Sequence, residues 1–221
     1  LQLSGVNVVL NDVITVANIP NLTFDPLANA NGTGYDSFQF TVNDGTQDST
    51  AAYTMTIDVT AINDPPTAAD FTITIDEDTS NTFAAGDFGF ADVDGDSLVS
   101  IEITQLAVLG SLELSSVAVV PNQVIVVANI PNLVYTPAAN GSGTGYDNFQ
   151  FTVNDGTTDS SPANTVTVDV TAGNDAPSFA GLDNTPTFVE DSTAVVLDSN
   201  ATISDPELDA INDYSCAKLT L

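Results

Sequence analysis

Hydrophobic and polar residues alternate with a period of two along much of the chain. In Phe71–Ile75 and again in Phe149–Val153, every second residue is large and apolar, and threonine or glutamine separates these residues. Val166–Val170 shows the same alternation, with Thr167 and Asp169 between the valines. Such a pattern buries one face of an antiparallel sheet and leaves the other face in water. No segment shows a convincing period of 3.6 residues, so we predict an all-β fold.

Clusters of Gly, Asn, Asp and Pro interrupt the alternating runs about every 8–12 residues, which is the spacing typical of a β-sandwich. In the middle of the chain we expect about seven strands, the number found in an immunoglobulin-like sandwich. These strands are predicted at residues 69–75, 82–88, 97–107, 112–119, 123–127 together with 132–136, 148–154 and 164–171.

The chain contains an internal repeat. Leu1–Asp64 aligns with Leu112–Asp175 without a gap at a constant offset of 111 residues, and roughly two residues in three are identical. A second alignment joins Glu77-Asp78 to Glu190-Asp191 at an offset of 113. The repeating unit therefore has about 111 residues, a size that suits one sandwich domain.

A short hinge ends each repeat. Asn63–Pro66 follows one strand-like run, and Asn174–Pro177 follows the corresponding run one repeat later. The prolines stop the preceding strand and stiffen the connection. With the hinges as boundaries, residues 1–64 are the C-terminal part of a first repeat, 65–175 are a complete repeat, and 176–221 are the N-terminal part of a third.

The partial repeats raise a question of assembly, because half a sandwich leaves one face of its core open. Two explanations are consistent with the sequence. Either the chain is cut from a longer protein, which we favour, or the end of one copy completes the start of the next copy.

The charge of the chain excludes several classes of partner. The sequence holds 30 acidic residues and one basic residue, Lys218, for a formal net charge of −29. Such a surface repels nucleic acids and anionic membranes. No apolar run is long enough to insert into a bilayer, and the lone Cys216 excludes an internal disulfide. A compact body with this charge repels itself unless counter-ions gather on it.

Most of the acidic residues are aspartates, which present oxygen on a short stem and suit Ca²⁺, a cation that takes about six to eight oxygen ligands. If seven strands run alternately down and up, the acidic turns gather at both ends of the sandwich. Each turn also has a simpler interpretation, since Asp-Gly pairs such as Asp155-Gly156 are ordinary turn formers. A solubilising acidic coat is a further alternative.

Six motifs follow one another in the chain: Asn-Asp-Pro-Pro at the hinge, Asp76–Thr79, Asp92–Asp96, Tyr135–Pro137, Gly145–Gly156 and Thr165–Thr171. In their order and spacing they resemble the cadherin-like tandem repeats of large bacterial surface adhesins. The resemblance implies tandem cadherin-like or immunoglobulin-like antiparallel sandwiches with Ca²⁺ between successive repeats. The ligands would come from the base of one repeat, from the hinge, and from the top of the next repeat.

Carried over by position, the resemblance implies two sets of calcium ligands. The first set is Asp36, Asn63, Asp64, Asp92, Asp94 and Asp155, and the second is Glu77, Asp147, Asn174, Asp175, Asp205 and Glu207. The sequence departs from the family pattern in two ways. Alanine replaces the acidic residue expected two positions before each hinge asparagine, and Asp205-Pro206-Glu207 replaces an Asp-x-Asp pair. The second departure implies fewer or more weakly bound ions at the second hinge.

The sequence argues against catalysis, because it has no His, no Arg and no Trp, and a Ser-His or Cys-His pair is therefore impossible. We expect a calcium-rigidified stalk or extender of a secreted or cell-surface adhesin or extracellular filament, whose partners are neighbouring repeats of the same protein. Two alternatives remain open. One is a calcium-dependent module that binds a cell-surface glycan or protein, and the other is a head-to-tail filament subunit whose terminal half-domains complete each other.

Overall fold

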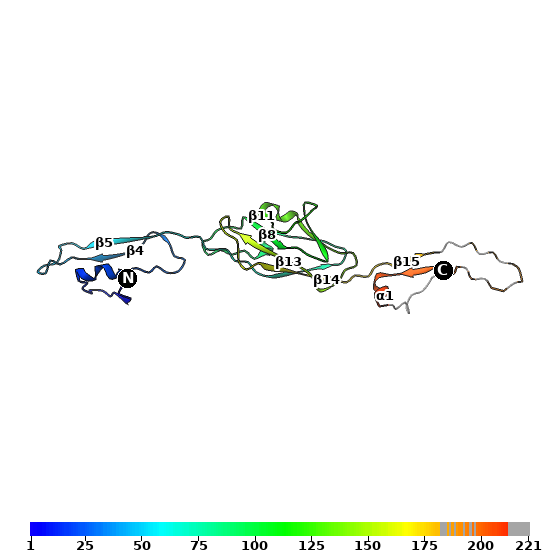
Figure 1. Cartoon of the computed structure of the whole chain (residues 1–221), viewed down its shortest axis with the longest axis horizontal. Helices are drawn as coiled ribbons and strands as arrows, with labels where there is room; N and C mark the ends of the chain where they lie inside the picture. Colours follow the sequence, from blue (N-terminus) through cyan, green and yellow to red (C-terminus); the bar gives the residue numbers. More distant parts are fainter. Residues whose placement is uncertain are drawn as a thin grey trace. The chain divides into compact units, whose positions relative to one another are not determined.

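The computed structural model describes residues 1–181, 185, 187, 189–191, 193, 194, 196 and 198–211. The chain falls into two compact units (Figure 1). The first consists of Leu1–Pro66 and Ala91–Ser97, and the second consists of Thr67–Phe90 and the chain from Leu98 onward. The predicted domain boundaries after residues 64 and 175 stay predictions.

The second unit contains a β-sandwich of two sheets, which confirms the all-β fold class. One sheet has the order β11-β8-β13-β14-β6, and the other has the order β10-β9-β12-β7. The strands are β6 (Phe71–Asp76), β7 (Asn81–Thr82), β8 (Ser100–Gln105), β9 (Gly110–Leu114), β10 (Val117–Ala118), β11 (Gln123–Val126), β12 (Leu133–Pro137), β13 (Gly143–Asn154) and β14 (Asn164–Thr171). All pairs are antiparallel except β14 with β6. These two strands run in the same direction at one edge of the five-stranded sheet.

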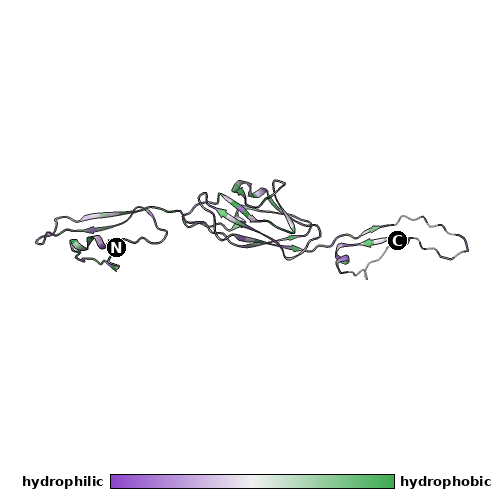
Figure 2. Cartoon of the chain, in the orientation of Figure 1, coloured by the Kyte–Doolittle hydropathy of each residue, from purple (hydrophilic) through white to green (hydrophobic). Residues whose placement is uncertain are grey.

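Large apolar residues from both sheets fill the core of the sandwich. Phe149 and Phe151 on β13 are fully buried, and the residues that follow each of them, Gln150 and Thr152, are only partly buried, as the period of two predicts. The ring of Phe151 packs edge-on against that of Phe88, with centroids 4.9 Å apart. Burying one phenylalanine side chain contributes about 1.5–3 kcal/mol. Hydrophobic and hydrophilic residues both occur along these strands (Figure 2).

Turns interrupt two of the predicted strands, at 82–88 and 112–119. The segment 82–88 is β7 followed by a 3-10 turn, η2 (Ala85–Phe88), in which Asp87 Oδ2 accepts the Ala84 N–H at 2.7 Å. The segment 112–119 divides into β9 and β10, because Ser115 and Ser116 adopt positive φ angles and turn the chain. Between β11 and β12 lies the 3-10 helix η3 (Val127–Asn132), which contains a proline.

The first unit repeats the back half of this sandwich at the offset of 111. Its elements are β1 (Gln2–Leu3), β2 (Val6–Asn7), the 3-10 helix η1 (Val16–Asn21), β3 (Leu22–Thr23), β4 (Gly32–Phe40) and β5 (Tyr53–Val59). They form a three-stranded sheet, β2-β1-β3, and the hairpin β4-β5. Small details also recur. Asp58 Oδ1 accepts the Gly34 N–H at 2.6 Å, as Asp169 Oδ1 does for Gly145, and both glycines adopt positive φ angles at a β-bulge.

The chain after the second hinge forms β15 (Ser178–Ala180), which pairs with β16 (Thr202–Ser204), and the helix α1 (Pro206–Ile211). No helix was expected here, since six residues are too few for a helical period to emerge. Asp205 starts the helix, because its Oδ1 accepts the N–H groups of Glu207 and Leu208, and a proline at the first helical position is favourable. Within the described residues, no helix is long and apolar enough to cross a membrane.

Candidate metal centres

Among the described residues, two clusters bring three carboxylate oxygens within 4.8 Å of one another. The first cluster, here called the Glu77 cluster, consists of Glu77, Asp175 and Glu207 in the second unit. The second, here called the Asp92 cluster, consists of Asp92, Asp94 and Asp96 in the first unit. Five of these six residues belong to the predicted ligand sets.

The Glu77 cluster draws its members from three separate parts of the chain. Glu77 directly follows β6, and its N–H donates to the Thr171 carbonyl at the end of β14 at 2.9 Å, which places Glu77 at one end of the sandwich. Asp175 lies in the hinge that follows β14, and Glu207 lies in α1. The end of β6, the segment after β14 and the helix α1 therefore each contribute one carboxylate.

Hydrogen bonds account for only part of this cluster. Glu77 Oε1 accepts the N–H of Gly173, and Glu207 Oε1 accepts the N–H of Asp175 at 3.2 Å. The atoms Asp175 Oδ2 and Glu207 Oε2 are buried and accept no hydrogen bond. Leaving a buried polar atom without a partner costs roughly 1–3 kcal/mol, and more for a charged group. The only basic residue in the sequence, Lys218, lies outside the described residues.

These oxygens fit a bound cation. The donor set consists of carboxylates, which hard divalent cations prefer, and a cation would occupy the two oxygens that accept no hydrogen bond. Without it, three negative charges would converge where water is partly excluded, which is unfavourable. The group that would hold the ion is thus Glu77, Asp175 and Glu207.

Two further predicted ligands lie close to this cluster. Asp205 is buried, and it lines a shallow pocket with Asp175, Asn140 and Asp209. By starting α1, Asp205 also fixes the position of Glu207. Asn174 Nδ2 donates to the Asp175 carbonyl at 2.9 Å and so holds the hinge in shape.

Asp147 requires a correction, because it has another role. Its Oδ1 accepts the N–H groups of Val108 and Asn148 at 3.0 and 2.8 Å. Its Oδ2 accepts the N–H groups of Leu109 and Gly110 at 2.9 and 2.8 Å and the hydroxyl of Tyr135 at 3.0 Å. Five donors occupy both oxygens, so the carboxylate ties a loop to the sandwich and has no free position for a cation.

The electrostatics of Asp147 follow from these contacts. Burial raises the pKa of this carboxyl, but the backbone hydrogen bonds from Val108, Asn148, Gly110 and Leu109 outweigh it, and the pKa lies below its ordinary value. Burial and the negative charge of Asp147 raise the pKa of Tyr135. The sequence did contain a signal for this role. Asp147 is in phase with Phe149 and Phe151, so the period of two places its side chain on the buried face.

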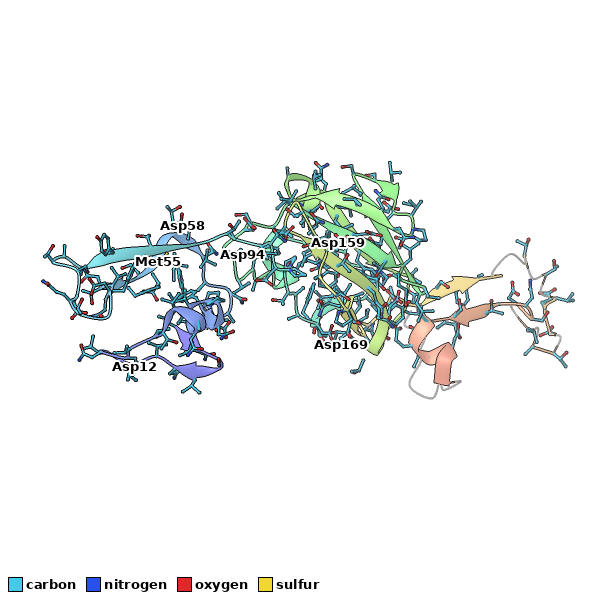
Figure 3. The ribbon with its side chains drawn as sticks, turned by 60° about the vertical axis from the view of Figure 1, so that its left-hand side comes forward. Asp12, Met55, Asp58, Asp94, Asp159 and Asp169 are labelled. Carbon is cyan, nitrogen blue, oxygen red and sulfur yellow. The ribbon has the colours of Figure 1, made fainter. Side chains whose placement is uncertain are left out.

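The Asp92 cluster is built around the first hinge. Asp94 is labelled in Figure 3. Its Oδ2 accepts the N–H of Asp64 at 2.7 Å. Asp92 Oδ1 accepts the N–H groups of Asp94 and Asp96, and Asp92 Oδ2 is buried with no hydrogen-bond partner. Asp96 was not among the predicted ligands. The sequence Asp-Val-Asp-Gly-Asp does contain a signal for it, because Asp96 follows Asp94 at the same spacing of two residues that separates Asp92 from Asp94.

The two hinges share one hydrogen-bond arrangement. At the first hinge the Asp64 N–H donates to Asp94, and at the second hinge the Asp175 N–H donates to Glu207. The preceding asparagine donates to the carbonyl of the hinge aspartate at both hinges, at 3.0 and 2.9 Å. The first acidic residue of each Asp-x-Asp or Asp-Pro-Glu segment accepts the N–H two residues further on. Asp205-Pro206-Glu207 differs from the Asp-x-Asp pattern of the family in sequence, but it forms the same hydrogen bonds as Asp92-Val93-Asp94.

The remaining predicted ligands, Asp36 and Asp155, belong to neither cluster among the described residues. Asp36 is exposed, and its Oδ1 accepts the N–H of the next residue, Ser37, at 2.7 Å. Asp155 Oδ1 accepts the N–H groups of Thr157 and Thr158 at 2.6 and 2.7 Å. This contact closes the turn between β13 and β14, as the simpler interpretation of an Asp-Gly pair predicts.

Comparison with known proteins identifies the middle of the chain. Residues 63–171, from the first hinge to the end of β14, match the family model described as bacterial Ig domain. Neither a curated protein nor a solved structure matches the chain. This match supports a bacterial Ig-like domain in this part of the chain, a structural type of domain that is typical of extracellular and surface proteins.

Proposed function

We propose that this chain is a calcium-rigidified stalk segment, built from tandem cadherin-like repeats, of a secreted or cell-surface adhesin or extracellular filament. The observation that carries the proposal is the convergence of Glu77, Asp175 and Glu207. One carboxylate belongs to the complete repeat, one to the hinge and one to the following repeat. A cation bound by all three would fix the angle at which one repeat follows the other.

The donor chemistry favours Ca²⁺ over other common cations. Zn²⁺ prefers His and Cys ligands, but the sequence has no His and its single cysteine is Cys216. Mg²⁺ demands a strict octahedron and keeps several of its waters, whereas Ca²⁺ tolerates flexible sets of carboxylate and carbonyl oxygens. Extracellular modules bind Ca²⁺ with dissociation constants of about 10⁻⁴–10⁻³ M, which suits an abundant external ion.

The proposed mechanism is a change in rigidity. Without the cation, the clustered carboxylates repel one another and the hinge samples several angles. A bound cation neutralises the cluster, and the proline of the hinge keeps the connection short and stiff. The same chemistry at Asp92, Asp94 and Asp96 would act at the first hinge, so that several repeats in a row would form a stiff rod when calcium is present.

A calcium titration of two matched variants tests the proposal. Glu207→Gln keeps the size of the side chain and removes its charge, so we expect the calcium affinity measured by calorimetry to fall roughly tenfold or more. Glu190→Gln makes the same chemical change at an exposed glutamate outside both clusters, and we expect it to leave the affinity unchanged. Wild-type protein that binds no Ca²⁺ at millimolar concentrations would contradict the proposal.

A further inference from the structure

The five-stranded sheet of the sandwich ends in the edge strand β11 (Figure 1). β11 pairs with β8 on one side, and no described strand pairs with its other side. The N–H of Val127 donates to the Val99 carbonyl at 2.9 Å, and the residues that bond to a given neighbour alternate along an antiparallel strand. Ile125 therefore exchanges its hydrogen bonds with β8, whereas the N–H and carbonyl groups of Val124 and Val126 point to the open edge.

The side chains beside this open edge are apolar and exposed. Val124 and Val126 are 59% and 47% exposed, and Ile125 between them is 1% exposed. Val120 is 58% exposed and lies in the turn before β11, where its carbonyl accepts the N–H of Gln123 at 3.1 Å. Val120, Val124 and Val126 are here called the β11 patch. It combines exposed valines with unpaired backbone groups, which favours the addition of another strand.

The other three edge strands of the sandwich are protected against such addition. β7 and β10 have two residues each, and a short edge strand offers few backbone groups to a partner. β6 follows Asp70 and ends with Asp76, and charged residues also oppose pairing. β11 has four residues, none of them charged or proline, and its register with β8 is continuous. It is therefore the edge at which another strand pairs most readily.

The distribution of charge indicates what binds at this edge. The chain has a formal net charge of −29, yet residues 114–146, which include β11, contain no charged residue. A basic partner is attracted to the acidic surface elsewhere on the chain, and other acidic proteins are repelled by that surface. Two copies of this chain, in contrast, approach each other with the least repulsion where neither presents a charge. The β11 patch meets this condition on both copies.

We propose that β11 pairs with β11 of a second copy of this chain, antiparallel about a twofold axis. The two Ile125 residues then lie opposite each other, and Val124 of each copy lies opposite Val126 of the other. These valine pairs exchange the hydrogen bonds that the open edge lacks. Because an antiparallel strand pair is complementary to itself, the contact closes into a dimer. The five-stranded sheet of one copy thus continues into that of the other.

The strength of this contact follows from its size and its charge. Glu102 on β8 lies opposite Val124, and three strand spacings, about 14 Å, separate the β8 strands of the two copies. This distance exceeds the Debye length of about 8 Å at physiological salt, so the two glutamates repel each other weakly. A four-residue edge buries less than the roughly 800 Å² per partner of a stable complex. The dimer is therefore weak, and salt strengthens it by screening the remaining acidic surface. The inference does not rest on the calcium proposal.

Sedimentation equilibrium of the 221-residue chain, in chelator and at moderate salt, tests the association. We expect the average mass to rise from 22.8 kDa towards twice this value as the concentration approaches about 1 mM. Val124→Glu places like charges on the paired edges and weakens the association at least about tenfold. Val108→Glu makes the same change at an exposed valine outside the β11 patch and leaves the association unchanged. A chain that stays monomeric up to this concentration, or equal effects of the two substitutions, overturns the proposal.

Hydrogen exchange of the unaltered chain, measured by NMR, locates the contact and remains informative if Val124→Glu disturbs the strand. The N–H groups of Val124 and Val126 face water in the monomer, and pairing protects them from exchange. We expect their protection to rise with the chain concentration, in step with the average mass. The N–H of Ile125 is bonded to β8 and is protected at every concentration. Exchange at Val124 and Val126 that stays unchanged while the mass doubles overturns the proposal.

Discussion

The backbone N–H of Asp175 donates a hydrogen bond to Glu207 Oε1 at 3.2 Å, so the second hinge is tied to the first turn of α1. The equivalent bond at the first hinge runs from Asp64 to Asp94. Glutamate at one position and aspartate at the other thus accept the same kind of bond. Glu207 lies in the helix α1, whereas Asp94 lies outside any helix or strand.

Removal of calcium should lower the thermal stability of the chain. A ligand at about 100 times its dissociation constant adds about 2.7 kcal/mol to the free energy of unfolding. For a chain of this size, this corresponds to a change of about 5–10 °C in the melting temperature. Calorimetry with and without a chelator measures the change, and an unchanged melting temperature would contradict the account.

Asp147→Asn should destabilise the sandwich strongly. The amide group has one acceptor oxygen, so it leaves some of the N–H groups of Val108, Leu109 and Gly110 without a partner. We expect a loss of roughly 2–4 kcal/mol in the free energy of unfolding by denaturant. Asp36→Asn is the matched control at the aligned position, where the side chain is exposed, and it should cost less than about 0.5 kcal/mol.

The contribution of Asp147 should depend on pH. Its pKa is lowered in the folded state, so the stability that it supplies is fully present above the unfolded pKa of about 3.9 and is lost as the pH falls through the folded pKa. The difference in stability between the wild type and Asp147→Asn should therefore be constant near neutral pH and shrink below about pH 4. A difference that stays constant into acid would show that the charge is not responsible.

Gly110→Ala should also destabilise the sandwich, because a Cβ at this position would overlap the Tyr135 hydroxyl and the Thr136 carbonyl. Overpacking of this kind costs typically about 1–3 kcal/mol. Gly86→Ala provides the control, since a Cβ there meets nothing within 4 Å, and it should change the stability little. Equal effects of the two substitutions on denaturant unfolding would contradict this interpretation.

The alternation of residues predicted the all-β fold because β13 and β14 each have one face in the core and one face in water. It overestimated the strands at 82–88 and 112–119, where Asp87 and the pair Ser115-Ser116 form turns that depend on local hydrogen bonds and positive φ angles. The helix α1 is too short for its period to be read. These features depend on capping and turn geometry, which a hydrophobic pattern does not record.

The residues of the candidate site were predicted only in part. The resemblance to cadherin-like repeats placed Glu77, Asp175 and Glu207 in one predicted ligand set, and these three carboxylates lie together in the fold. Asp147 was predicted as a ligand from its position just before a strand, whereas its phase in the buried pattern places it on the inner face, where five N–H and O–H groups bind it.

A crystal structure grown in calcium, with its anomalous difference map, tests the central claim most directly. The account predicts a Ca²⁺ ion bound by carboxylate oxygens of Glu77, Asp175 and Glu207 at distances of about 2.3–2.6 Å. If these three carboxylates contact only water at saturating calcium, the hinge is not held by a metal and the account is wrong.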